Sequence, residues 1–291
     1  MKIGLLTDST CDLNPELLNK HDIEFVPLSI YFSEEISYKD IVDIQYEAFF
    51  RKLAEAENIP TTTQPAIGLF VQKYEEMLEK YDAIISIHLS EKLSGTCQTA
   101  RMAANQVSGD IHVIDSKSAT LGLGFQVIKI KKMINKGKKP DEIVDYIKEL
   151  RQSIDIYFTI NELTYLQKGG RIGKAQAFLG SILNFYPILL LSGKSGEITP
   201  YEKVRGKKKI VSKLINIVET ETEGVDEASL GFVHAIEMKH YENFKEKLVK
   251  QLEDKDLKYI KNESWVSSVL GSHVGPSVYG VVIAKGETLE I

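Results

Sequence analysis

The chain has 291 residues, of which 43% are hydrophobic and 26% are charged, and its formal net charge at pH 7 is −5. These values are typical of a globular protein with a sizeable core, and the acidic balance disfavours nucleic acid as a partner. The two cysteines, Cys11 and Cys97, lack the spacing of a zinc site, and no apolar run has the length of a signal peptide or a transmembrane helix. We therefore expect a cytoplasmic protein without a metal or other cofactor.

The first half of the chain alternates strand patterns with helix patterns. Strand-like runs cover residues 3–6, 24–32, 83–88 and 111–114. Helical patterns start at Asn14-Pro15, cover 40–57, follow Gln64-Pro65 to about Lys80 and Ser94-Gly95-Thr96 to about Val107, and cover 119–136 and 140–151. This alternation predicts an α/β lobe with a mainly parallel sheet over residues 1–155. Ligands of such sheets bind at the carboxyl ends of the strands, where Asp8-Ser9-Thr10 lies.

The second half of the chain has a different pattern. Strands are expected over 156–160, 186–192, 197–204, 229–234, near Tyr259 and over 278–284, and helices over 173–184, 206–222 and 240–254. This order predicts an α+β lobe over residues 156–291, with a ligand cleft between the two lobes.

Two hydroxyl-rich motifs about thirty residues apart are the main candidates for a binding site. They are Thr61-Thr62-Thr63-Gln64-Pro65 and Leu93-Ser94-Gly95-Thr96, and each precedes a predicted helix. Hydroxyls and free backbone N–H groups at two helix starts can bind an anion such as a carboxylate without a cationic side chain. The simpler interpretation is that each motif only caps its helix.

A third motif, Gly271-Ser272-His273-Val274-Gly275-Pro276, places a histidine in a predicted tight loop. There His273 can donate to an anion or to nearby hydroxyls. No carboxylate lies close to it in sequence, so a triad is not indicated. Ser94 lacks the G-x-S-x-G pattern of a hydrolase nucleophile. An enzyme that uses Ser94 or His273, either an esterase or a transferase of small carbonyl compounds, remains the alternative hypothesis.

Two further segments concern partners and apolar ligands. A basic cluster precedes the helix predicted at 206–222, and it is either a solvated surface or a docking patch; it consists of Lys203, Arg205, Lys207, Lys208 and Lys209. The run 185–191, together with Phe178, Leu179, Ile182 and Leu183, is apolar enough to form core or to line a tunnel for an alkyl chain. Arg171 is expected at the surface or between the lobes.

Taken together, these motifs resemble the DegV family along the whole chain. The matching segments are Thr7-Asp8-Ser9-Thr10-Cys11-Asp12, Thr62-Thr63-Gln64-Pro65, Ser90, Leu93-Ser94-Gly95-Thr96-Cys97-Gln98, Asp115-Ser116, Gly122-Leu123-Gly124, Leu166-Gln167-Lys168-Gly169-Gly170-Arg171-Ile172, Lys203-Val204-Arg205-Gly206-Lys207-Lys208-Lys209 and Ser272-His273-Val274-Gly275-Pro276. Each segment is weak evidence alone, and their order and spacing make the resemblance specific.

The resemblance implies a two-lobed protein that buries one long-chain fatty acid between its lobes. It also implies a carrier rather than an enzyme, which presents the fatty acid to a separate ATP-dependent fatty acid kinase for acyl-phosphate formation. Carried over by position, Thr62 and Ser94 hold the carboxylate, Thr63, Gly95 and Thr96 lie close by, and His273 completes the polar network. Arg171, Arg205 and Lys207 lie on the side that faces the kinase or, transiently, a membrane. The chain has no nucleotide-binding motif of its own.

Overall fold

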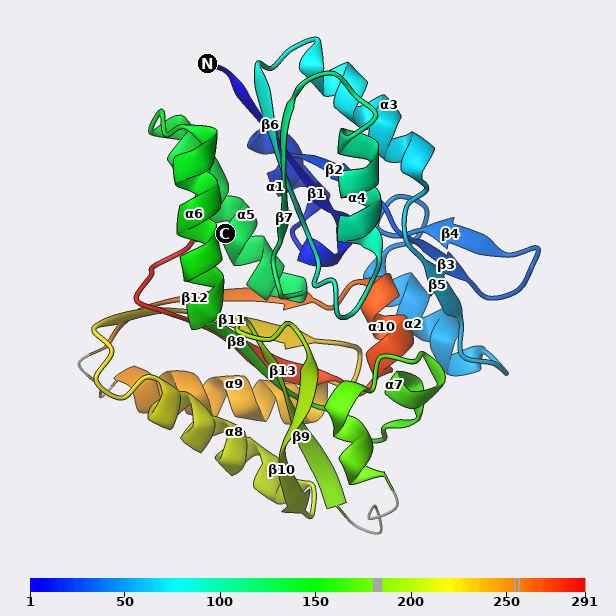
Figure 1. Cartoon of the computed structure of the whole chain (residues 1–291). Helices are drawn as coiled ribbons and strands as arrows, with labels where there is room; N and C mark the ends of the chain where they lie inside the picture. The colour runs from blue at the N-terminus through cyan, green and yellow to red at the C-terminus, as the bar shows by residue number, and fades with distance from the viewer. Residues whose placement is uncertain (180–184, 254, 256, 291) are drawn as a thin grey trace.

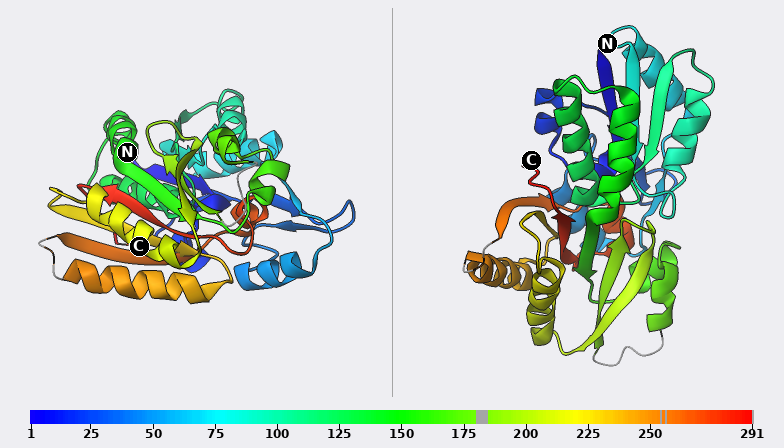
Figure 2. Two further views of the ribbon diagram at one scale, coloured as in Figure 1. Left: turned by 90° about the horizontal axis from the view of Figure 1, so that it is seen from below. Right: turned by 60° about the vertical axis from the view of Figure 1, so that its left-hand side comes forward.

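The structure is a computed structural model that describes residues 1–179, 185–253, 255 and 257–290. Two large β-sheets define two lobes, which are stacked along the long axis of the molecule (Figure 1, Figure 2). The α/β architecture expected from the sequence, a parallel-sheet lobe followed by a mixed α+β lobe, is confirmed.

The sheet of the first lobe has four parallel strands. In spatial order they are β2 (Glu24–Val26), β1 (Ile3–Asp8), β6 (Ala83–His88) and β7 (Asp110–Asp115). β1 and β6 are buried along their whole length, because the parallel sheet is covered by helices on both faces. The carboxyl ends of these strands point toward the second lobe (Figure 1).

Six helices belong to the first half of the chain. They are α1 (Pro15–Lys20), α2 (Tyr46–Glu55), α3 (Ile67–Leu78), α4 (Thr96–Ala104), α5 (Thr120–Asn135) and α6 (Pro140–Leu150). α3 and α4 pack on one face of the sheet, and α5 and α6 on the other (Figure 1). The expected cap of α1 is present, since the Asn14 side chain accepts from the Glu16 backbone N–H at 2.8 Å and Pro15 occupies the first helical position.

Two expectations for the first half are wrong in a way that affects the site. The run 24–32 is not one strand, because it divides into β2 and β3 (Ser29–Tyr31), which belong to different sheets. β3 forms a small antiparallel sheet with β4 (Ser37–Lys39) and β5 (Thr61–Thr63). The first hydroxyl motif therefore lies in an extended strand and not at a helix start, since α3 begins only at Ile67.

The sheet of the second lobe has six strands. In spatial order they are β10 (Ile198–Arg205), β9 (Phe185–Ser192), β8 (Ile154–Thr159), β13 (Tyr279–Lys285), β11 (Glu227–His234) and β12 (Lys258–Trp265). Only β11 and β12 pair in parallel. Helices α8 (Lys208–Glu221) and α9 (Met238–Glu253) cover the outer face. The inner face packs against α5 of the first lobe, and the two lobes share one continuous core.

Three short helical segments surround the space between the lobes. They are α7 (Thr164–Lys168), the 3₁₀ helix η3 (Gly173–Phe178) and α10 (Ser268–Val274). Of the helix expected over 173–184, the structure has the 3₁₀ helix η3 in the described part. Residues 180–184, which include Ile182 and Leu183, lie outside the described residues. The segment expected to be a tight loop around His273 is helix α10.

Helix α10 comes from the second half of the sequence but packs on elements of the first. It contacts α2, β3 and β5 as well as α7 (Figure 1). Gly271 permits this approach, because a Cβ at that position would lie 2.7 Å from the Phe50 ring and 2.9 Å from the Phe49 ring. The expected boundary between the lobes at residue 155 remains a prediction. Helix α10 follows this boundary in the sequence but packs on elements that precede it.

Candidate functional site

A cavity of about 300 Å³ lies between the lobes. Its wall combines hydroxyl, amide, guanidinium and imidazole groups with aliphatic side chains. The lining residues are Leu28, Thr62, Thr63, Gln64, Leu89, Leu93, Ser94, Leu166, Arg171, Ile198, Val269, Leu270, His273 and Val274. Segments far apart in sequence, including both hydroxyl motifs and the His273 segment, therefore meet around one space.

Thr62 and His273 form the polar contact that links β5 to α10. The Thr62 hydroxyl Oγ1 and His273 Nε2 are 2.7 Å apart, and both side chains are half-buried. Thr63 follows on the same strand and also lines the cavity. The strand geometry explains why the β-branched threonines suit this motif, and the helix-start explanation does not apply to it.

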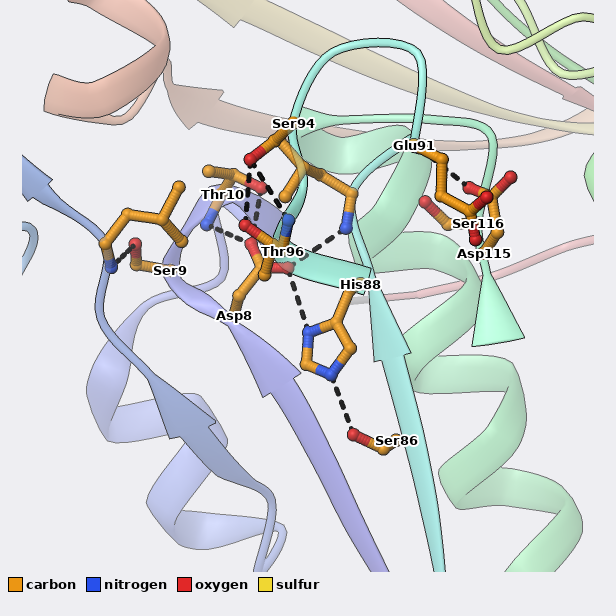
Figure 3. Close-up of polar contacts among 12 residues, drawn as sticks. Asp8, Ser9, Thr10, Ser86, His88, Glu91, Ser94, Thr96, Asp115 and Ser116 are labelled. Atoms are coloured by element: carbon orange, nitrogen blue, oxygen red, sulfur yellow. Dashed lines mark hydrogen bonds and ion pairs between the residues drawn. The ribbon is translucent and has the colours of Figure 1, made fainter. Parts of the chain in front are cut away.

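The second hydroxyl motif does precede a helix, as expected. Gly95 is the N-cap of α4, and Thr96 is its first residue. The Ser94 and Thr96 hydroxyls are 2.9 Å apart, a contact drawn in Figure 3. Ser94 lines the cavity, whereas Thr96 is fully buried behind it. Gly95 lies against the Gln64 side chain, whose amide donates to the Thr99 hydroxyl at 2.6 Å, so the two motifs are packed together.

Arg171, expected at the surface or between the lobes and assigned by the resemblance to a partner-facing side, lines the cavity between the lobes. Its Nε donates to the Leu93 carbonyl at 3.0 Å and its Nη1 to the Gly169 carbonyl at 2.7 Å. The guanidinium thus joins the second lobe to the loop that carries Ser94. Its charge also means that the cavity offers a cation to an anionic ligand, in contrast to the expectation of neutral groups alone. The sequence indicated a turn at Gly169-Gly170-Arg171, but it did not indicate where the Arg171 side chain lies in space.

His273 is uncharged at neutral pH. Burial, with a further contribution from the Arg171 charge, lowers its pKa from 6.5 to about 4. A neutral imidazole has one donor and one acceptor nitrogen. If the proton is on Nε2, His273 donates to Thr62 Oγ1, and the Thr62 O–H is then free to donate into the cavity.

Gly169 is predicted to be essential for the position of the His273 ring. A Cβ on Gly169 would lie 2.3 Å from His273 Nδ1. Gly169 has an ordinary φ of −73°, so alanine is acceptable to the local backbone, and its shortest contact is with the His273 ring, ahead of the Tyr165 carbonyl oxygen at 3.0 Å. We expect Gly169→Ala to weaken binding of a cavity ligand by roughly tenfold, the loss of about one oriented hydrogen bond to a charged group.

The matched control for Gly169→Ala is Gly68→Ala. Gly68 lies in α3, and a Cβ there would meet nothing within 4 Å. Ligand titration of both variants checks the prediction, and equal affinities for the two would contradict it.

A second, entirely apolar cavity of about 70 Å³ lies next to the first. The two cavities share Leu93, Ile198, Leu270 and Val274 as walls. The other lining residues of the smaller one are Ala119, Thr120, Ile156, Phe158, Leu191, Val233, Val266 and Val278. A polar chamber and an apolar chamber separated only by these shared side chains suit an elongated amphiphile. Of the apolar run 185–191, Leu191 lines this second cavity.

The predicted docking residues Arg205 and Lys207 lie away from the cavity lining. Arg205 is exposed at the end of β10 and has no ion pair among the described residues. Lys207 precedes α8, and its Nζ is 3.7 Å from a Glu237 carboxylate oxygen. The exposed charge of Arg205 suits a role toward an acidic partner, whereas Lys207 is half-buried beside Glu237; the docking role of both remains a prediction.

A Ser–His–Asp hydrogen-bonded chain occurs in the first lobe, but solvent does not reach it. Asp8 Oδ2 is 3.1 Å from His88 Nδ1, and His88 Nε2 is 2.7 Å from Ser86 Oγ (Figure 3). All three side chains are fully buried, and Ser86 also accepts from the Tyr74 hydroxyl. Asp8 further accepts from the Leu89 backbone N–H at 3.0 Å. This series of hydrogen bonds therefore fixes the carboxyl ends of β1 and β6 rather than acting on a substrate.

The nucleophile–base pair that the enzyme hypothesis needs is not formed in the described part of the chain. Ser94 Oγ contacts Thr96, whereas His273 Nε2 contacts Thr62. An activated serine needs a base within hydrogen-bond reach. Ser94 is therefore not activated by His273 in this arrangement, in which His273 is paired with the Thr62 hydroxyl.

Comparison with known proteins identifies the family. Residues 2–286 match the family model described as "Uncharacterised protein, DegV family". The chain is 34% identical over 286 residues to Protein DegV of Bacillus subtilis, with 97% of this chain and 98% of that protein covered. The chain therefore belongs to the DegV family.

Two similar solved structures are those of fatty-acid-binding members of this family. A DegV family protein from Thermus thermophilus, described for its fatty acid binding, has 31% identity and a TM-score of 0.90, with 98% of this chain and 100% of that chain covered. DegV from Bacillus subtilis, described as a fatty acid binding protein, has 30% identity and a TM-score of 0.87, with coverages of 98% and 99%.

No helix in the described part of the chain is long and apolar enough to cross a membrane.

Proposed function

We propose that this protein binds one long-chain fatty acid, with the carboxylate at the polar groups of the larger cavity and the acyl chain along the aliphatic walls that continue from this cavity into the apolar one. The observation that carries the proposal is the pair of adjoining cavities with shared aliphatic walls, one lined by Thr62, Ser94, Arg171 and His273 and the other by apolar side chains. The fatty acid binding described for the relatives from Thermus thermophilus and Bacillus subtilis supports it.

The two ends of the ligand contribute differently. Burying an acyl chain of about sixteen carbons gains on the order of 10 kcal/mol at ~0.8 kcal/mol per CH₂ group. The carboxylate receives hydrogen bonds from the Thr62 and Ser94 hydroxyls and charge from Arg171, with Thr63, Gly95 and Thr96 in support. The aliphatic walls of the two cavities therefore supply affinity, and the polar groups supply orientation.

The experiment that tests the proposal is native mass spectrometry of the purified full-length protein, followed by lipid extraction. We expect one fatty acid per chain, and its identity defines chain length and saturation. A lipid-free protein that also fails to bind added palmitate would overturn the proposal.

We further propose that the protein acts as a carrier that presents its fatty acid to a separate ATP-dependent kinase. Among the described residues Ser94 contacts Thr96 and not His273, and we assign chemistry on the carboxylate to a partner. The exposed Arg205 and the half-buried Lys207 form the docking side, and Arg171 lies at the seat of the carboxylate. A transient contact with a membrane surface would allow the lipid to enter.

We expect Arg205→Glu to leave fatty acid affinity unchanged and to weaken coupling to the kinase several-fold, because it reverses an exposed charge outside the cavity lining. Acyl-phosphate formation with a fixed amount of kinase measures the coupling. Lys136→Glu, a charge reversal at the exposed end of α5, is the control. Unchanged coupling in Arg205→Glu would remove the docking role.

The enzyme alternative is tested by ester hydrolysis. An esterase would lose turnover in Ser94→Ala and His273→Ala, whereas the carrier shows no turnover in any form.

A further inference from the structure

Two buried carboxyl groups lie at the junction of the lobes, behind the wall of the proposed fatty acid site. Asp12 follows the 3₁₀ turn η1 (Ser9–Cys11) at the end of β1, and Asp40 follows β4. Asp12 is 1% exposed and Asp40 is 0% exposed. The residues assigned to ligand binding do not include them, so their burial calls for another explanation.

Both carboxyl groups hold the start of α10. Asp12 Oδ1 accepts from the Ser267 backbone N–H at 3.1 Å, and Asp40 Oδ1 accepts from the Ser268 backbone N–H at 3.1 Å. The Ser264 hydroxyl donates to the Asp12 carbonyl at 2.6 Å. Asp12 has a left-handed backbone conformation with φ of 53°, which directs the chain toward these donors. Residues more than 220 positions apart are thereby joined.

The same helix carries ligand-facing groups along its length, from its second residue to its last. Val269, Leu270, His273 and Val274 of α10 all line the polar cavity, and His273 contacts Thr62. A seven-residue helix is about 10 Å long, so a shift at its start moves its whole length. The two carboxyl groups hold the start of this helix, and Thr62 contacts His273 near its end. These contacts together fix α10 against the first lobe.

The carboxyl pair is also connected to the apolar cavity. The η1 turn that precedes Asp12 packs against α5, whose first residue, Thr120, is part of the apolar cavity wall. Thr120 is a β-branched residue with φ of 47°, a conformation that only a well-determined environment maintains. The polar junction thus contacts structures that line both chambers.

We propose that Asp12 and Asp40 are positioning residues for the carboxylate site, which hold α10 at the angle that lets His273 orient Thr62. The inference rests on the proposed fatty acid function. It assigns no direct ligand contact to either carboxyl group.

Substitution by asparagine or by alanine distinguishes the role of the acceptor oxygen from that of the negative charge on the carboxyl group. Burial raises the pKa of Asp40 to about 7 and that of Asp12 well above its usual value, so Asn is a close substitute for a protonated carboxyl. Asp40→Asn keeps an acceptor for the Ser268 N–H and is expected to bind palmitate within threefold of the wild type. Asp40→Ala removes the acceptor and is expected to bind at least tenfold more weakly.

A double-mutant cycle with His273→Ala distinguishes positioning from general destabilisation. If Asp40 acts through α10 and His273, Asp40→Ala costs less than threefold in palmitate affinity once His273 is already alanine. An equal loss in both backgrounds, or no loss in either, would overturn the proposal. Asp43→Ala is the matched control, because Asp43 accepts a backbone N–H at 2.7 Å from Lys39 rather than from α10.

A second variant tests the bond from the donor side if Asp40→Ala does not fold. Proline is favoured at the first position of a helix and lacks an N–H, and Ser267 has the extended conformation that proline requires before it. Ser268→Pro therefore removes the donor and preserves α10, and we expect at least a tenfold loss of affinity.

The NMR signal of His273 Nε2 gives a readout without ligand. We expect it to shift in Ser268→Pro and not in Asp43→Ala, and an unshifted signal would contradict the positioning role. Failure of the wild type to bind palmitate would instead count against the proposed function.

Discussion

Replacing Thr62 by valine is expected to weaken fatty acid binding by roughly 10- to 150-fold, the equivalent of about 1.5–3 kcal/mol for a hydrogen bond to a charged group. Valine has nearly the shape of threonine and suits the short strand β5, so the fold should be unaffected. The loss has two sources, since the carboxylate loses a donor and His273 Nε2 loses its partner at 2.7 Å. Calorimetric titration with palmitate measures the affinity.

The control for this substitution is Thr61→Val on the same strand. Thr61 is exposed and is not part of the cavity wall, so palmitate affinity should stay within twofold of the wild type. Thermal unfolding of both variants checks the fold. If the melting temperature of Thr62→Val falls in step with its affinity, Thr62 is structural and its assignment to the carboxylate fails.

The second large effect concerns acid. Burial lowers the pKa of His273 in the folded chain to about 4, from 6.5 for an unperturbed histidine. Between these values the unfolded state binds more protons, so stability falls as the pH drops from 6.5 toward 4. A difference of about 2.5 pH units corresponds to about 3 kcal/mol. We expect the wild type to lose this amount, relative to His273→Gln, between pH 7 and pH 4.

The comparison with His273→Gln is needed because Asp40 acts in the opposite direction. Its pKa is raised from 3.8 to about 7, so its contribution to stability is lost as the pH rises through this range. Asp40 is present in both proteins, and its effect cancels in the difference. Denaturant unfolding at the two pH values gives the measurement, and equal acid sensitivity in both proteins would refute the buried neutral state of His273.

The sequence predicted the regular elements better than their assembly. Continuous apolar runs identified β1 and β6, because a strand buried on both faces leaves little alternative. The cap at Asn14 and the helix start at Gly95-Thr96 followed from local chemistry. The Thr62 segment was expected at a helix start, because a threonine before a Gln-Pro pair equally suits a cap and an edge strand. Pairing with β3 decided the matter.

The candidate site shows the same division. Thr62, Thr63, Ser94 and His273 were selected from the sequence and line one cavity in the structure. Arg171 was selected for docking, and no local pattern indicated that its guanidinium reaches the Leu93 carbonyl of the other lobe. No local pattern in the sequence indicated a structural role for Asp12 or Asp40, because the backbone N–H groups that they bind lie more than 220 residues away.

By itself the sequence determined the α/β class, the candidate hydroxyl groups and the family, since these depend on short-range periodicity and on the order of motifs. Only the tertiary structure decided that α10 crosses to the first lobe, that Arg171 lines the cavity and that a polar and an apolar chamber adjoin. The reason is physical. Helix and strand patterns arise within a few residues, whereas a binding site depends on the relative placement of segments that only packing and inter-lobe hydrogen bonds determine.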